Sequence, residues 1–266
     1  MGWHGMAYAK QLGSGSEGTL TELNGDSVVP PYGDEMQLVA LLARQEGGSA
    51  IDYIKIESNV WPGAYDLEIG DVQNDLAPLR RFLRPSETIT VKAKQSTGAS
   101  KYLFVALLIR TADPEVPRGQ GEILARQVTP TAGAGSWGGT PATIGPGTSD
   151  ALIPSHDYAL IGAQVDEGII KVEATSFAGK PAFVGAEKPL YLPTGMRFRG
   201  DDTLKVYACG PSASAVNVVL FFEDLGPSRG GPIATRAPTG PLREMPTRPG
   251  ITFPGGFRGI LREIIG

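Results

Sequence analysis

The chain carries one order of strand-like segments twice, and this duplication limits the fold more than any other feature of the sequence. Each copy has an aliphatic pair ending in proline, an apolar run, a Glu-Gly turn, a short alternating segment, a longer one and a last apolar run. The first copy has these at 28–30, 36–43, 46–47, 54–57, 87–93 and 102–109. The second has them at 152–154, 158–165, 167–168, 170–173, 202–208 and 216–222. The offset falls from 124 to 115 residues, so the second copy has shorter loops.

Side chains within these segments alternate as they do in strands of a half-buried sheet. Ile89, Val91 and Ala93 fall on one face of their segment with polar residues between them, which is a period of two. Turn signals recur at a spacing of roughly 8–12 residues, which is typical of sandwiches and jelly rolls. We therefore expect an all-β protein with two tandem jelly-roll-like β-sandwich domains, at residues 27–112 and 150–226.

The closing run of the first copy, residues 102–109, is apolar or aromatic at every position. A strand has this composition when both of its faces are covered. We expect the opposite sheet to cover one face, and a neighbouring domain or subunit to cover the other.

Two short segments suggest other structures. Residues 71–82 are expected to form a short helix, with Asp75 as its cap and Leu76, Leu79 and Phe82 on one side. Residues 13–18 match the spacing G-x-G-x-x-G, but a dinucleotide loop needs a preceding apolar strand and a following helix. Neither is indicated here, so this segment is interpreted as part of a flexible arm.

Three segments have compositions that do not favour a packed core, and we expect them to lie outside the two domains. They are an N-terminal arm at 1–26, a Gly/Pro-rich connector at 113–149 and a Pro/Arg-rich C-terminal arm at 227–266. From residue 226 onward there are six arginines and two glutamates, a net charge of +4, so the remaining chain is −8 of a total of −4. A basic tail on an acidic body suits docking onto another copy of that body; a solvated tail is the alternative.

The arms and the connector supply the residues expected to contact neighbours in an assembly. Indole rings in Gly-rich segments generally need a pocket. The apolar residues of 257–265 have helical spacing in a segment too short to be stable alone, which predicts a hook that folds when it docks. The expected assembly contacts are Trp3, Trp137, Arg229, Arg236, Arg243, Arg248, Phe257, Ile260, Leu261, Ile264 and Ile265.

Few residues could support catalysis. A nucleophilic site would have to use His4 or His156, the two histidines, and the one cysteine, Cys209, lies within an expected strand, where a free thiol is normally a core residue. No spacing typical of a metal site occurs. The pair Asp201-Asp202 follows a glycine and is interpreted as turn chemistry rather than a metal site. We expect no catalytic residues, no cofactor, no metal and no small-molecule ligand.

Targeting signals are absent from the sequence as it stands. The start lacks a basic region followed by an apolar core, so no secretory signal is expected. No apolar run approaches the 18 residues or so of a membrane span. The single cysteine indicates a reducing compartment or a chain without disulfides.

Two aromatic residues and the basic tail allow other interpretations. Trp61 and Tyr65 beside a Pro-Gly turn are most simply core or interface residues, but they could also form a platform for sugars. The six arginines of the tail could neutralise phosphates of packaged nucleic acid, although no recognised binding module is present. We expect no specific nucleic-acid recognition.

The end of each copy also resembles a known class of protein. In the second copy, residues 192–198 lead through a turn into the alternating segment 203–208, and a small-residue turn then precedes the apolar strand 215–220. This ending resembles the jelly-roll capsid, cement and tail-associated domains of bacteriophages and related viruses, over roughly 160 residues of the two copies. The chain departs from large double jelly-roll capsid proteins in its shorter copies and long connector. That departure leaves open a shell, cement, decoration or connector role.

The resemblance implies a non-enzymatic virion structural protein. It would be made in the host cytoplasm, form homo-oligomers through its doubly apolar strands, and attach to its own copies and other virion proteins through its arms. The alternative is a carbohydrate- or cell-surface-binding β-sandwich module that uses Trp61 and Tyr65. An unrecognised hydrolase is a further alternative.

Overall fold

The computed structural model describes residues 3–25, 36–48, 51–68, 73–76, 79, 81–84, 87–95, 98–110, 115–177 and 179–228. Met1–Thr235 belongs to one compact unit, and Arg236–Gly266 forms a second unit that lies outside the described residues.

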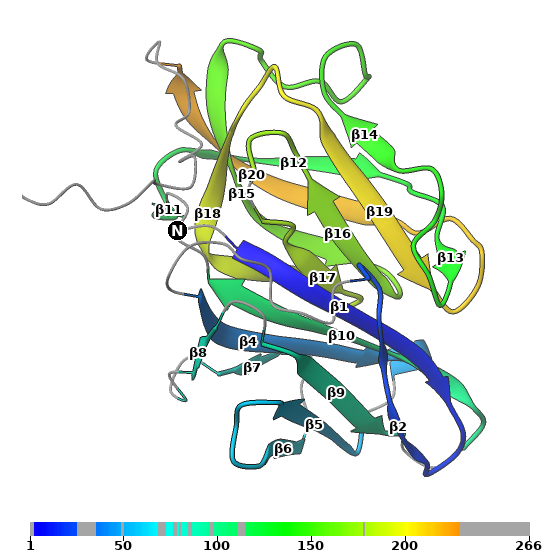
Figure 1. Ribbon diagram of the computed structural model, residues 1–266. Coiled ribbons are helices and arrows are strands. Elements are labelled where there is room, and N and C mark those ends of the chain that lie inside the picture. Colours follow the sequence, from blue (N-terminus) through cyan, green and yellow to red (C-terminus); the bar gives the residue numbers. More distant parts are fainter. Residues whose placement is uncertain are drawn as a thin grey trace, which may run out of the picture. The chain divides into compact units, whose positions relative to one another are not determined.

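The first half of the chain folds into two facing β-sheets (Figure 1). One sheet has the order β3-β1-β10-β4-β7, with β8 also paired to β4; the other has the order β2-β9-β5-β6. The 3₁₀ turn η1 (Glu46–Gly48) joins β4 to β5. The strands are β1 (Trp3–Leu12), β2 (Glu17–Thr19), β3 (Thr21–Glu22), β4 (Met36–Gln45), β5 (Tyr53–Ser58), β6 (Ala64–Glu68), β7 (Gln73–Asp75), β8 (Arg81–Leu83), β9 (Ile89–Lys94) and β10 (Lys101–Arg110).

The second half repeats this arrangement. One sheet has the order β11-β18-β15-β20-β12, and the other has β13-β19-β16-β17 with β14 also paired to β19. All described pairings are antiparallel except the short one between β13 and β19. The strands are β11 (Glu115–Val116), β12 (Glu122–Val128), β13 (Gly133–Ala134), β14 (Ala142–Ile144), β15 (His156–Val165), β16 (Ile169–Glu173), β17 (Ala182–Val184), β18 (Leu190–Arg199), β19 (Leu204–Gly210) and β20 (Val218–Pro227).

The two halves share one topology, which confirms the predicted fold class. The order β1-β10-β4 corresponds to β12-β20-β15, with β7 and β8 together at the place of β18. The order β2-β9-β5-β6 corresponds to β14-β19-β16-β17. Each half is therefore a jelly roll, in which chain-distant strands such as β1 and β10 become neighbours because the connections cross between two sheets. We call them jelly roll 1 and jelly roll 2.

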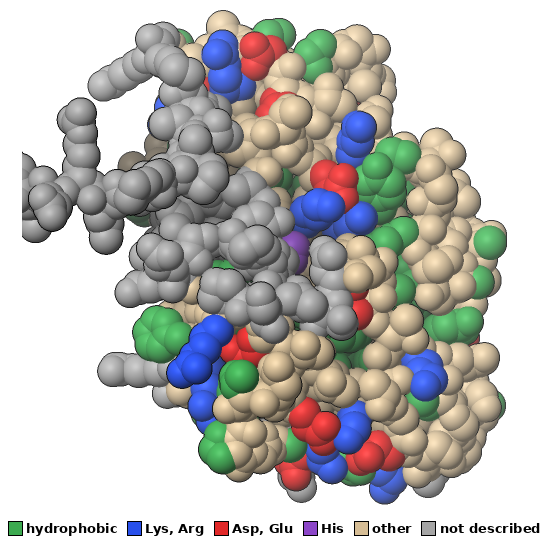
Figure 2. All heavy atoms as spheres, viewed as in Figure 1, with side chains coloured by type: hydrophobic (Ala, Val, Ile, Leu, Met, Phe, Trp, Pro, Cys, Tyr) green, Lys and Arg blue, Asp and Glu red, His purple; other side chains and the backbone are tan. Residues whose placement is uncertain are grey.

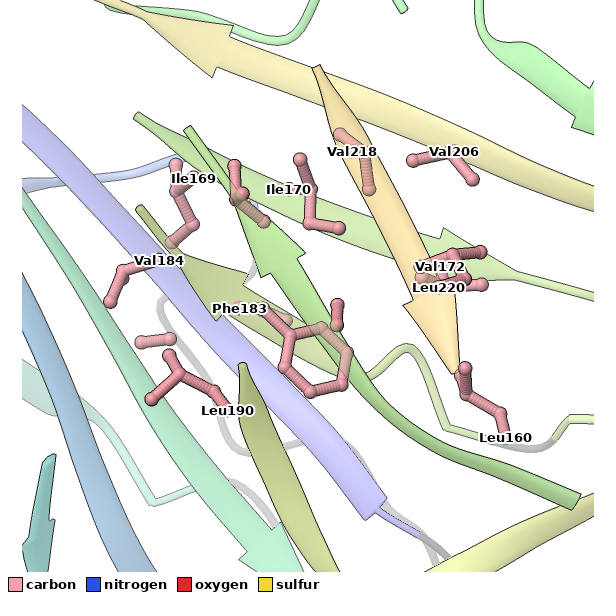
Figure 3. Close-up of a cluster of buried hydrophobic side chains, with 14 of the residues drawn as sticks. Leu160, Ile169, Ile170, Val172, Phe183, Val184, Leu190, Val206, Val218 and Leu220 are labelled. Carbon is pink, nitrogen blue, oxygen red and sulfur yellow. The ribbon is translucent and has the colours of Figure 1, made fainter. Parts of the chain in front are cut away.

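Each jelly roll has its own apolar interior. In jelly roll 1, buried residues such as Met6, Leu41 and Val91 fill the space between the two sheets. In jelly roll 2, Phe183, Val206 and Leu220 do so, and Figure 3 shows these side chains converging from facing strands. The second cluster continues out of jelly roll 2 to include Ala7, Phe104 and Leu108 of jelly roll 1. The two domains therefore share a buried junction.

Strand β10 shows how this junction is built. Leu103, Val105 and Leu107 point into the core of jelly roll 1. The alternate residues Phe104 and Leu108 point the other way and pack with jelly roll 2. The prediction that this run is covered on both faces is confirmed, and the second cover is the neighbouring domain of the same chain. Oligomerisation is not needed to explain the doubly apolar strand.

The segments expected to be an arm and a connector are corrected by the structure. Residues 3–12 of the expected N-terminal arm form β1, which pairs along its whole length with β10. Within the expected connector, β12 and β14 are strands of jelly roll 2. Both segments supply the first strands of a jelly roll, because β12 occupies the place in its sheet that β1 occupies in the other. The Gly-Ser segment 13–18 is the turn between β1 and β2 and the start of β2.

The short helix expected at 71–82 is also wrong. Its described residues include strands β7 and β8, which both pair with β4. An edge position on β4 was open to them, and completing a sheet satisfies backbone hydrogen bonds that an isolated helical turn would leave exposed.

Candidate functional site

The junction between the jelly rolls is the best-defined candidate site among the described residues. It forms where the outer face of the β1-β10-β4 sheet lies against β16 and β17. The backbone amide of Gly5 donates to the carbonyl of Lys180 at 2.9 Å, and the Trp3 indole nitrogen donates to the carbonyl of Thr194 at 2.9 Å. These bonds tie the first strand of one domain to the loop before β17 and to β18 of the other.

Small side chains permit this close approach. A Cβ added at Gly5 would lie 2.6 Å from the amide nitrogen of Ala182, which is closer than real Cβ contacts. A Cβ at Gly179 would meet the backbone carbonyl carbon of Trp3 at 2.9 Å. Glycine at both positions is therefore explained by contact between backbones of the two domains.

His4 is a buried polar group within this junction. Its Nδ1 accepts a hydrogen bond of 3.2 Å from the backbone amide of Lys180. Burial lowers the pKa of His4 from 6.5 to about 4, and the nearby charges of Lys180 and Lys171 lower it further in the same direction. The imidazole is therefore neutral at neutral pH and serves as a hydrogen-bond acceptor between the two domains.

The ammonium group of Lys171, on β16, is the most enclosed charged group at the junction. Its ammonium lies 5.0 Å from the ring centre of Trp137 and 4.8 Å from that of Tyr207, and it pairs with Glu173 at 2.9 Å. The Trp137 indole donates to the amide oxygen of Asn24, which belongs to jelly roll 1. Cation–π contacts strengthen when water is excluded, so this group helps to seal the edge of the junction.

A cleft of about 390 Å³ opens beside the junction. Its apolar part comes from Trp3, Val39, Ala40 and Pro193, and exposed or half-buried polar side chains surround it. This mixture of an apolar surface and a few polar groups is typical of small-ligand sites. The polar lining residues are Gln37, Gln73, Asp75, Arg110 and Thr194.

A second hollow, of about 270 Å³, lies between the two Glu-Gly turns that the sequence repeats. Glu46 and Glu167 both line it, together with Asp166 and Arg44. Partial burial raises the pKa of Glu167, and the charges of Glu46 and Asp166 raise it further. Asp166 accepts hydrogen bonds from Asn217, and Glu46 accepts one from the backbone of Tyr102, so these acids also hold local structure.

The structure corrects the role expected for one tryptophan and leaves the others as predictions. Trp3 is 2% exposed, so it is a junction residue rather than a surface contact for a neighbouring subunit. Trp137 is partly buried, and the pocket expected for its ring is formed by Asn24, Lys171 and the core of its own chain. Its expected contact with a neighbour stays a prediction.

The tail residues lie outside the described residues. They are Arg229, Arg236, Arg243, Arg248, Phe257, Ile260, Leu261, Ile264 and Ile265. Their expected assembly contacts therefore stay predictions.

The sugar platform expected at Trp61 and Tyr65 is only partly described. Trp61 packs at the margin of the jelly roll 1 core, and the Arg81 guanidinium lies 5.0 Å from its ring centre. The Tyr65 side chain lies outside the described residues. The platform stays a prediction.

The residues considered for catalysis or metal binding are Cys209, His156 and Asp202, and each is buried or hydrogen-bonded within the fold. Cys209 is buried, and burial raises the pKa of its thiol to about 12, which keeps it protonated. His156 pairs through Nδ1 with Asp224 at 2.9 Å, and its ring stacks on that of Tyr158. Asp202 accepts a hydrogen bond from the backbone amide of Thr203, as the turn interpretation predicts. It also accepts one from the backbone amide of Ser176, in a different turn, which that interpretation did not include.

Within the described part of the chain, no group of three or more His, Cys, Asp or Glu side chains could hold a metal ion. The described segments also contain no helix long and apolar enough to cross a membrane.

Two buried acids near the end of β20 were not anticipated from the sequence. Glu223 is 2% exposed and accepts hydrogen bonds from the backbone amides of Gly119 and Gln120. Asp157 binds Arg197 and also the Ser228 hydroxyl, at 2.6 Å. Burial alone would raise the pKa of Asp157, but the Ser228 and Arg197 bonds lower it. The sequence did indicate that Glu223 could be buried, because this residue directly follows an apolar run. Its hydrogen-bond partners are more than 100 residues away, so the sequence did not indicate them.

Comparison with known proteins identifies no family. No protein-family model and no curated protein matches the chain. A cupin 2 conserved barrel domain protein from Leptotrichia buccalis matches at 10% identity, over 83% of this chain and 84% of that chain, with a TM-score of 0.20. An IolB-like protein from Salmonella typhimurium matches at 12% identity, over 85% of each chain, with a TM-score of 0.20.

A third solved structure is a tandem of carbohydrate-binding modules. The CBM22-1–CBM22-2 domains of Xyn10C from Paenibacillus barcinonensis match at 14% identity, over 84% of this chain and 93% of that chain, with a TM-score of 0.18. At these TM-scores the three likenesses carry no argument about function. The class of protein defined by fold and site is a tandem jelly-roll protein with a buried domain junction.

Proposed function

We propose that the protein is a non-enzymatic structural protein of a virion, a subunit of a capsid shell or of its cement or decoration layer. The observation that carries the proposal is the stacking of two jelly rolls of the same topology into one unit through a buried sheet-to-sheet junction. A jelly roll joined to its repeat in this way presents a large, regular surface for packing copies side by side, and jelly rolls are a recurrent architecture of viral capsids.

The polar groups support a structural role. Buried or enclosed groups such as His4, Lys171 and Glu223 have partners that hold the fold together. The hydrogen-bonded position of Asp202 and the raised pKa of Cys209 offer neither a free base nor a reactive thiol. The basic composition of 227–266 against an acidic body favours attachment to other copies.

The test compares the full chain with a chain ending at Ser228. This end point is chosen because Pro227 pairs with His156 and Ser228 bonds Asp157, so removal of 227–266 would damage β20 itself. We expect the full chain to form large oligomers by light scattering and electron microscopy. The shortened chain should keep its circular dichroism spectrum and assemble poorly. A full chain that stays monomeric at all concentrations, or normal assembly of the shortened chain, would contradict the proposal.

A second candidate function, carbohydrate binding, is favoured by the cleft beside the junction. Two glutamine amides and Thr194 beside an apolar surface suit the hydroxyl groups and C–H faces of a sugar. The test is a glycan array with the wild type, a Gln37→Ala variant in the cleft, and a Trp61→Ala variant at the separate predicted platform. Binding lost in only one variant identifies the site; no glycan bound by the wild type removes this candidate.

A further inference from the structure

Strand β12 ends the β11-β18-β15-β20-β12 sheet of jelly roll 2, and one of its two edges is unpaired among the described residues. Its other edge pairs along the whole strand with β20. No backbone hydrogen bond joins the outer edge of residues 122–128 to another described segment. Such an edge presents backbone N–H and C=O groups to which a further strand can add. We call it the open edge of β12.

The equivalent strand of jelly roll 1 has partners on both sides. β1 takes the place in its sheet that β12 takes in the sheet of jelly roll 2. It pairs with β10 on one side, and on the other its Tyr8 and Ala9 pair with β3. The amide of Gly5 also donates to the carbonyl of Lys180. The same edge is therefore occupied within the chain in one copy and open in the other.

Of the strands that end a sheet in the described structure, β12 is the longest. It has seven residues and contains no proline, glycine or lysine. The opposite edge of the same sheet, β11, has two residues and is followed by Pro117. Short edge strands, prolines and charges of one sign discourage the addition of a further strand. β12 lacks the first two of these, and its charges are of both signs.

The next longest edge strand, β6, is a poorer site for a second copy of itself. Its five residues include Asp66 and Glu68 and no basic residue. Two copies of β6 side by side would therefore place like charges close together, which destabilises a strand pair. Figure 2 shows basic and acidic side chains intermixed over this end of jelly roll 1.

The sequence of β12, in contrast, is complementary to itself when two copies run antiparallel. With Leu124 opposite the second copy's Leu124, Glu122 lies opposite Arg126 on both sides of the centre, and Ile123 lies opposite Ala125. Cross-strand pairs of opposite charge and of apolar side chains stabilise a sheet. A centre at Ala125 would instead place Leu124 opposite Arg126, so the register centred on Leu124 is favoured.

The surroundings of these side chains fit the same register. Leu124 packs against the core of jelly roll 2, so Ile123 and Ala125 point outward. In this register the outward residues meet each other, and the side chain of Ile123, which is 60% exposed, gains an apolar neighbour. In the described structure Arg126 uses one of its five guanidinium donors on the carbonyl of Ala125. Its other donors can bind the second copy's Glu122.

We propose that two copies of this chain pair antiparallel through the open edge of β12, which joins one sheet from each copy into a continuous sheet. The inference rests on the proposed assembly function and names one contact through which copies join. The contact is two-fold symmetric, because the same residues face one another on both copies. It therefore joins copies in pairs, and other contacts must link these pairs into larger assemblies.

The first experiment measures the dissociation of the full-length oligomer by light scattering over a range of concentrations. Glu122→Arg and Arg126→Glu each place like charges opposite one another in both symmetric pairs, and each should raise the dissociation concentration about tenfold. The double variant Glu122→Arg/Arg126→Glu restores opposite charges and should return dissociation to the wild-type value. The matched control is Lys188→Glu, an exposed position between β17 and β18, which changes the net charge as much as Arg126→Glu does and should leave dissociation unchanged. Circular dichroism checks that every variant is folded.

The second experiment tests the register with cysteines. Full-length Ile123→Cys and Ala125→Cys chains are mixed and oxidised mildly. Directly opposite residues have Cβ atoms about 4.5–5.5 Å apart, within reach of a disulfide, whereas residues offset by two are about 7–8 Å apart. The mixture should therefore form a disulfide between the two variants, and either variant alone should form little. Cys209 is buried and should not take part.

The outcomes separate this inference from the proposed function. Single charge variants that dissociate like wild type, or a double variant that does not restore dissociation, would overturn the inference. A mixture without the disulfide while oligomers persist would also overturn it, and is the result expected if the chain's own residues 229–266 or a different partner lie along β12. Each of these results leaves the proposed function standing, because copies would then join through another surface. A chain that never oligomerises would overturn both.

Discussion

Strands β5 and β16 occupy the same place in the two jelly rolls and have nearly the same sequence, but their outward faces lie in different surroundings. Lys55 on β5 and Lys171 on β16 are equivalent residues. The Lys55 ammonium lies 5.5 Å from the Tyr53 ring centre and near Glu17 and Asp66, all on its own sheet. Lys171 is enclosed by Trp137 and Tyr207 at the junction.

The difference shows that a repeated sequence does not imply a repeated environment. The side chain of Lys171 is 11% exposed and that of Lys55 is 25% exposed. What changes is the layer outside the strand, which is solvent for β5 and jelly roll 1 for β16. The junction therefore makes the outer residues of one copy behave as core residues, and four experiments test this.

The largest effect is expected for the two neighbouring leucines of β10. Leu107→Ala removes packing from the core of jelly roll 1, and Leu108→Ala removes it from the junction. Each should lower the free energy of unfolding by about 2–5 kcal/mol, the usual cost of a buried leucine truncated to alanine. Denaturant unfolding measures both. A Leu108→Ala chain as stable as wild type would show that the junction adds no stability.

The next prediction concerns pH and His4. Its pKa is about 4 in the folded protein and 6.5 when exposed, so between these pH values the unfolded chain binds a proton that the folded chain does not. The free energy of unfolding should therefore fall as pH is lowered from 6.5 to 4, by about 3 kcal/mol at most.

The matched variant is His4→Gln, which can still accept a hydrogen bond from Lys180 but does not titrate. Subtracting its pH profile of stability from that of wild type removes the shared contribution of the carboxylates. The difference should shrink as pH falls through this window. If the two profiles of stability against pH run parallel, folding does not lower the pKa of His4, and its imidazole is in contact with water.

A smaller effect is expected at Gly5, where the two domains approach most closely. Gly5→Ala places a methyl group against the backbone of Ala182 and should cost about 1–3 kcal/mol, as overpacking usually does. The control is Gly139→Ala, where an added Cβ meets nothing within 4 Å. Thermal unfolding of the two variants gives the comparison, and equal melting temperatures would contradict a close junction.

The smallest effect on stability is expected for Lys171, and the equivalent residue Lys55 provides the comparison. Lys171→Met keeps the aliphatic stem but removes the charge held between two rings, and it should cost about 1–2 kcal/mol. Lys55→Met should cost less than about 0.5 kcal/mol, because partly exposed ion pairs contribute little. Chemical denaturation of both variants at equal ionic strength provides the measurement. Equal losses would mean that the junction does not alter the environment of this position.

The sequence by itself determined the all-β class, the duplication and the doubly covered strand β10. These features depend on the periodicity of apolar residues and on long apolar runs. Both can be seen in the sequence, whichever partner each strand packs against. The same pattern indicated a core role for Cys209 and a turn role for Asp202, because burial and turn chemistry are largely local.

Only the tertiary structure decided the position of the first strands of each jelly roll and the identity of the junction. Gly5, Ala7 and Ala9 were interpreted as parts of a flexible arm, yet they are small because another domain lies against them. Glycine and alanine are favoured by mobile segments and by close packing alike, so composition cannot distinguish the two. The distinction depends on contacts such as Gly5 with Lys180, which join residues 175 positions apart and leave no periodic trace in the chain.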